Sequence, residues 1–145
     1  MKPLDGESFL AERLLWVFKK TGCSGEHTMP FLDLHRERQR RLSTQLELRD
    51  PEVPVVVCFH ADDDWTLQTT RRLLWRDRTG THEAENCEIS NVSIDLQALR
   101  NARSKLQASG LVIQTRTGDA FRLALEPGPP LSGFWNVIKT IAGPP

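Results

Sequence analysis

The sequence predicts an α+β fold in which helices at both ends flank a set of antiparallel strands. Three patterns support this class. Apolar residues recur at helical spacing near the N-terminus, a β-branched run occupies 53–59, and alternating residues around a Thr-Gly-Asp turn predict a hairpin at 111–125. A second helical apolar stripe follows that hairpin. Because these patterns share 145 residues, one domain with one core is expected.

The N-terminal third is expected to be helical. Asp5 or Ser8 can cap a first helix that runs to about Lys20 and ends at a glycine-rich loop. A second helix is expected from near Thr28, with Pro30 in its first turn and a charged block at 36–41. Prolines at 51 and 54 end it. Residues 1–49 would therefore form an N-terminal helical extension.

The middle of the chain predicts strands. Residues 55–59 are typical of a buried strand, and 65–68 alternate as a half-buried strand does. Further extended segments are expected at 72–76 and 89–96, separated by polar turns. After the hairpin, Pro127 to Pro130 interrupt the chain and a final amphipathic helix is expected over 131–141. Residues 96–108 fit either a capped helix or a strand, and the sequence leaves this open.

Charge and composition limit the function classes. Lys and Arg total 19 and Asp and Glu total 19, so the chain lacks the basic excess of nucleic-acid-binding proteins. No apolar stretch approaches the roughly 20 residues of a membrane span, and no signal-peptide pattern begins the chain. Cys23, Cys58 and Cys87 are odd in number and widely spaced, which favours a reducing, cytoplasmic location.

The middle segments carry a resemblance to a known family. Residues 65–75, with a Thr-x-x-Arg turn at 69–72, are followed by an Ile-Ser-Asn-Val segment, a glycine hairpin and a last helix containing Trp135. This order resembles bacterial PH-like (pleckstrin-homology-like) domains over residues 53–142. The resemblance implies a bent, partly open barrel of about seven strands capped by the last helix. It also implies a binding module similar to small free-standing immunity or adaptor proteins. Fold analogy alone assigns no chemistry.

Two groups of residues are candidate metal ligands. Asp62, Asp63 and Asp64 could offer oxygen ligands to a cation, but the residues after them lack the ligand offsets of a calcium loop, so a solvated turn is favoured. That turn remains a candidate acidic contact for a basic partner. Cys23, His27 and His35 lack the paired spacing of zinc ligands, so no metal and no cofactor are expected.

Arginines and tryptophans supply the other candidate residues. Arg71 and Arg72 belong to a cluster around the predicted turn at 69–72, and arginine suits the recognition of phosphate and carboxylate groups. Nearby acids dilute this positive charge, so a mixed solvated surface is the alternative. The four tryptophans are expected in the core, although Trp65 or Trp75 could instead be an exposed binding anchor.

The sequence thus favours binding over catalysis. It contains no nucleophile elbow, no phosphate-cradling glycine loop and no dinucleotide-binding fingerprint. We predict a non-enzymatic protein-binding module, specifically a bacterial immunity-type protein that neutralises a partner toxin. The predicted partner-binding residues are Asp62, Asp63, Asp64, Trp65, Arg71 and Arg72. The alternatives are a peripheral binder of anionic lipid headgroups that uses Arg71 and Arg72, and a small enzyme without a recognisable motif.

Overall fold

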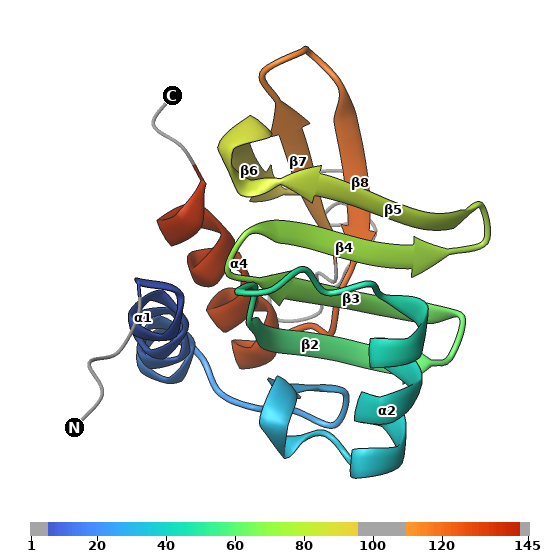
Figure 1. Cartoon of the computed structure of the whole chain (residues 1–145). Helices are drawn as coiled ribbons and strands as arrows, with labels where there is room; N and C mark the ends of the chain where they lie inside the picture. Colours follow the sequence, from blue (N-terminus) through green and yellow to red (C-terminus); the bar gives the residue numbers. More distant parts are fainter. Residues whose placement is uncertain (1–5, 96–109, 143–145) are drawn as a thin grey trace.

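Two antiparallel sheets and two long terminal helices make up the computed structural model of the chain, which describes residues 6–95 and 110–142 (Figure 1). The first sheet has the strand order β1-β2-β3-β4-β5 and the second the order β6-β7-β8. The sheets do not close into a barrel. The α+β class is therefore confirmed, and the described residues contain eight strands where the resemblance implied about seven. The helices are α1 (Gly6–Thr21), α2 (Arg36–Gln45) and α4 (Pro129–Ile141), and the strands are β1 (Thr28–Pro30), β2 (Pro54–Ala61), β3 (Asp64–Thr69), β4 (Arg72–Asp77), β5 (Gly80–Glu85), β6 (Ile89–Ile94), β7 (Gly110–Thr115) and β8 (Ala120–Ala124).

Most of the predicted elements are confirmed. The first helix, the strand at 55–59, the turn at 69–72, the hairpin around 117–119 and the final helix all lie where the patterns place them. Gly118 has a φ of 95°, the left-handed conformation that glycine adopts without strain in such a turn. Residues 96–108, for which helix and strand are both open, lie outside the described residues.

The predicted start of the second helix is wrong. Thr28–Pro30 is a short edge strand that pairs with β2, with Thr28 opposite Cys58 and Pro30 opposite Val56. A 3₁₀ turn at Phe31–Asp33 follows, and α2 begins only after His35, whose Nδ1 accepts a hydrogen bond from the Glu37 amide at 3.3 Å. Proline is tolerated in an edge strand, because on the solvent-facing side no neighbouring strand needs the N–H that proline lacks.

The five-stranded sheet is buried on both faces. Along β2 successive side chains point to opposite faces, as the pleat requires. Val56 and Cys58 join the main core with α1, α4 and the second sheet, whereas Val57 and Phe59 join a smaller core beneath α2. The N-terminal extension thus contributes to both faces of the sheet, with α1 in the main core and α2 over the smaller core.

α1 and α4 pack closely against each other at the edge of the main core (Figure 1). A methyl group at Gly133 of α4 would lie 2.8 Å from Cδ2 of Phe18, which is fully buried. The Ser132 hydroxyl donates to the Thr21 carbonyl at 3.0 Å, where α1 ends. These contacts fix one side of α1 against α4 and leave its other side facing outward. None of the helices in residues 6–95 and 110–142 has the length and apolarity that a bilayer crossing needs.

Candidate functional site

The outward side of α1 exposes two aromatic residues. Phe9 is 63% exposed and Trp16 is 59% exposed, and with Leu32 they are the large apolar side chains that lie open among the described residues. At 100° per residue, Phe9, Arg13, Trp16 and Lys20 fall within an arc of about 60° on the helix. The opposite side carries the buried Ala11, Leu14 and Phe18. We call Phe9, Arg13, Trp16, Lys19 and Lys20 the α1 surface.

This surface was missed because both sides of α1 carry apolar residues. The sequence-based interpretation assigned Trp16 to the core from its apolar neighbours, and the structure corrects this assignment. Leu14 and Phe18 already fill the contact with α4 and the sheet, so Trp16 lies on the far side of the helix. The Phe9–Trp16 spacing of seven residues is the signal that could have indicated a second apolar stripe.

Basic side chains surround the two aromatic rings. Lys20 Nζ lies 4.5 Å from the centroid of the Trp16 ring, in a cation–π contact. Arg13, Lys19 and Lys20 form no ion pair with any residue that the structure describes. Of the two acids of α1, Glu7 is engaged by Arg71 at 3.0 Å, which leaves Glu12 as the carboxylate beside these cations.

The acidic triplet lies at the turn between β2 and β3. Asp62, Asp63 and Asp64 are all exposed. Asp62 forms an ion pair with Arg41 of α2 at 3.1 Å, and its backbone carbonyl accepts hydrogen bonds from Gln45 and Arg76. The triplet is therefore available to solvent, while one of its carboxylates also ties the turn to α2.

Trp65 and Arg72, two of the predicted partner-binding residues, are buried. Trp65 is 1% exposed because it faces the small core that α2 covers. Arg72 donates from Nε and Nη2 to the two oxygens of Glu52, at 2.9 and 3.1 Å, and from Nη1 to Glu83. Neither side chain can contact a partner while these layers are in place, so the predicted exposed anchor at Trp65 is corrected.

The buried pair determines the ionisation of Glu52. Burial by itself would raise the pKa of this carboxyl, but hydrogen bonds from Arg72, Thr69 and the Arg49 amide outweigh burial and hold the pKa below its ordinary value of 4.5. Glu52 therefore stays ionised opposite Arg72. The arrangement is that of a structural ion pair.

Arg71, the remaining predicted residue, is exposed and far from the acidic triplet. Asp64 begins β3 and Thr69 ends it, so the two turns lie roughly 17 Å apart along the strand. Arg71 reaches across to Glu7 in the first turn of α1. The structure thus places the acidic triplet at one turn, Arg71 at the opposite turn, and Trp65 and Arg72 in the interior. It does not assemble these predicted residues into one site.

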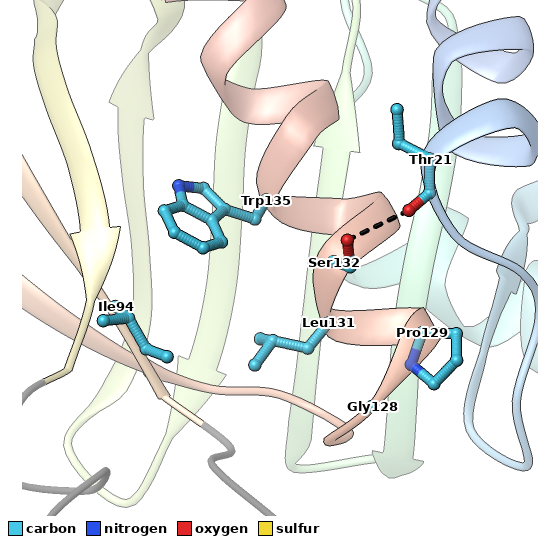
Figure 2. A pocket seen from close by; sticks show the side chains of 7 residues that line it. All are labelled: Thr21, Ile94, Gly128, Pro129, Leu131, Ser132 and Trp135. Atoms are coloured by element: carbon cyan, nitrogen blue, oxygen red, sulfur yellow. Dashed lines mark hydrogen bonds between the residues drawn. The ribbon is translucent and has the colours of Figure 1, made fainter. Parts of the chain in front are cut away.

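An apolar pocket of about 400 Å³ lies beside the start of α4. Figure 2 shows its lining, with Leu131 and Trp135 of α4 facing Ile94 of β6. The polar groups at its wall already have partners, since Ser132 donates to Thr21 and the Trp135 indole N–H donates to the Val92 carbonyl at 3.2 Å. The pocket offers apolar contact and no group placed for chemistry.

Two of the histidines and one of the cysteines lie close together at β2. The rings of His27 and His60 have centroids 4.4 Å apart and are tilted by 44° to each other, and Cys58 Sγ lies 3.5 Å from His60 Nε2. Cys58 is fully buried, and burial raises the pKa of its thiol, which opposes the reactive thiolate form. Cys23 and His35 lie elsewhere on the surface, and residues 6–95 and 110–142 contain no group of three His, Cys, Asp or Glu side chains arranged to hold a metal ion.

Comparison of the chain with protein-family models, with curated proteins and with solved structures finds no match. The similarity to PH-like domains therefore stays a prediction.

Proposed function

We propose that the protein is a non-enzymatic binding module and that the α1 surface is its docking face. The observation that carries this proposal is the exposure of Phe9 and Trp16 on one side of a helix whose other side is buried. Large aromatic side chains contribute most of the binding energy in many protein interfaces when a partner removes them from water. Two such residues on a rigid helix, about two turns apart, provide paired anchors at no ordering cost for the backbone.

The experiment is affinity capture from cells of the native host with three versions of the chain. The wild type is expected to retain a stoichiometric protein partner. The Phe9→Ser/Trp16→Ser double variant is expected to lose it, because both apolar anchors are gone. Leu32→Ser is the matched control, since Leu32 is 78% exposed and lies in the turn before α2, away from α1.

Each result is decisive for the docking face. All three proteins are expected to keep the same thermal midpoint, because the substituted side chains are exposed. Retention of the partner by the double variant would contradict the proposal for α1. Loss of the partner by the Leu32 variant alone would move the docking face to the turn before α2.

The immunity-type role remains a narrower proposal within this class. It predicts that the captured protein is toxic when it is produced without the chain and harmless when both are produced together. A captured protein that is harmless alone would leave a binding module of another kind. Co-purification of lipid in place of protein would favour the headgroup-binding alternative.

A further inference from the structure

The charges beside Phe9 and Trp16 indicate the chemistry of the surface that covers them. The whole chain is electrically neutral, yet the outward side of α1 carries Arg13, Lys19 and Lys20 against the single carboxylate of Glu12. These cations are all exposed. Burying them beneath an apolar or basic partner would cost free energy, because charged groups lose hydration without gaining a counter-charge.

We propose that the α1 surface docks into an apolar groove with an acidic rim on a protein partner. This inference rests on the proposed binding function and adds the chemistry of the partner. Phe9 and Trp16 lie about 10 Å apart along the helix axis, two anchors that fit one continuous groove. Arg13, Lys19 and Lys20 flank that line, where carboxylates on the rim of the groove meet them.

A protein groove fits this surface better than a membrane does. A helix that binds at a lipid surface immerses a broad apolar face among the acyl chains. In α1 the broad apolar face, with Ala11, Leu14 and Phe18, is already buried in the protein. The outward side offers only two large exposed apolar side chains, Phe9 and Trp16, which is too narrow an apolar face for that mode of binding.

The test measures the affinity of the captured partner for charge variants that keep both aromatic anchors. Arg13→Glu/Lys19→Glu/Lys20→Glu is expected to weaken binding by at least about tenfold and to reverse its dependence on salt, because the rim carboxylates are then repelled and added salt screens that repulsion. The matched control is Arg36→Glu/Arg40→Glu/Arg49→Glu, which makes the same change in net charge at exposed positions away from α1. The control is expected to bind within about twofold of the wild type.

Photo-crosslinking locates the contact independently. A photoreactive phenylalanine analogue in place of Glu12 lies between the two anchors and is expected to label a partner peptide that contains both carboxylates and apolar residues. Labelling of a peptide without carboxylates, or of a second copy of this chain, would overturn the inference. The inference would also be overturned if the wild-type protein captured no protein and sedimented with vesicles of phosphatidylcholine and phosphatidylserine.

The outcomes separate this inference from the function on which it rests. If the aromatic double variant loses the partner and the charge-reversed variant keeps wild-type affinity, the docking face stands and the acidic groove is wrong. If the wild type captures no protein at all, the binding function itself fails.

Discussion

Arg71 and Arg72 are adjacent in the chain and have opposite environments. Arg71 ends the turn after β3 and stays exposed, while Arg72 begins β4 with a side chain only 8% exposed. The difference arises because Glu52, twenty residues earlier, places its carboxylate where β4 starts. A sequence pattern places both arginines at the turn, but the distant carboxylate decides which of them is a structural residue.

Replacing Arg72 with Ala is expected to lower the free energy of unfolding by about 3–5 kcal/mol, because the Glu52 carboxylate then stays buried without a counter-charge. Urea unfolding at neutral pH measures the change. Arg78→Ala is the control, since Arg78 is exposed in the β4–β5 turn, and a change within about 0.5 kcal/mol is expected there. Equal effects of the two substitutions would show that the buried pair does not stabilise the fold.

At the scale of elements, α1 shows how one helix carries two apolar sides with different roles. Leu14 and Phe18 pack inward and Phe9 and Trp16 face outward. The inward side is specified by shape as well as by hydrophobicity, because the Phe18 ring lies over Gly133 of α4. A small residue at 133 therefore sets how closely the two helices approach.

Gly133→Ala is expected to destabilise the protein by about 1–3 kcal/mol, although alanine is the better helix former. The added methyl would lie 2.8 Å from Cδ2 of the Phe18 ring, which is fully buried. Thermal and chemical unfolding measure the loss. Gly6→Ala in the first turn of α1 has nothing within 4 Å of the new methyl, and it is expected to be neutral or slightly stabilising. A stabilised Gly133 variant would contradict the tight contact between α1 and α4.

At the scale of the molecule, one carboxylate connects distant parts of the chain. Glu126, just after β8, accepts hydrogen bonds from the amides of residues 26, 27 and 28 at 2.7, 3.0 and 2.9 Å. Burial opposes its ionisation, but the amides of His27, Glu26 and Thr28 outweigh burial and hold the pKa of Glu126 below its ordinary value of 4.5. The charged carboxylate thus holds the edge strand β1 against the end of the second sheet.

This linkage predicts acid sensitivity of the whole fold. Because the folded-state pKa lies below the unfolded value, the unfolded chain takes up the proton more readily. The stabilisation by Glu126 is therefore complete above pH 4.5 and is lost as the pH falls through the folded-state pKa. Denaturant unfolding between pH 7 and pH 3 is expected to show a smaller acid loss in Glu126→Gln than in the wild type. Identical pH profiles would exclude Glu126 as a contributor, and Glu88→Gln at an exposed position is the control.

Local patterns specify the order of most elements. The helical spacing of α1 and α4, the β-branched run of β2 and the turn residues of the β7–β8 hairpin each act over a few neighbouring residues, so they can be read from the sequence. The error at Thr28–Pro30 shows the limit of such patterns. That segment is a strand because β2 and Glu126 bind its backbone, from about 30 and 100 residues away.

Exposure, by contrast, depends on how the layers stack. The α2 layer buries Trp65, the Glu52 carboxylate withdraws Arg72 from the surface, and close packing of α1 on α4 leaves Trp16 outside. No local pattern contains these outcomes, because each depends on a partner that is remote in sequence. The sequence therefore determines the α+β class and the order of its parts, while tertiary packing decides which side chains, Phe9 and Trp16 among them, remain exposed.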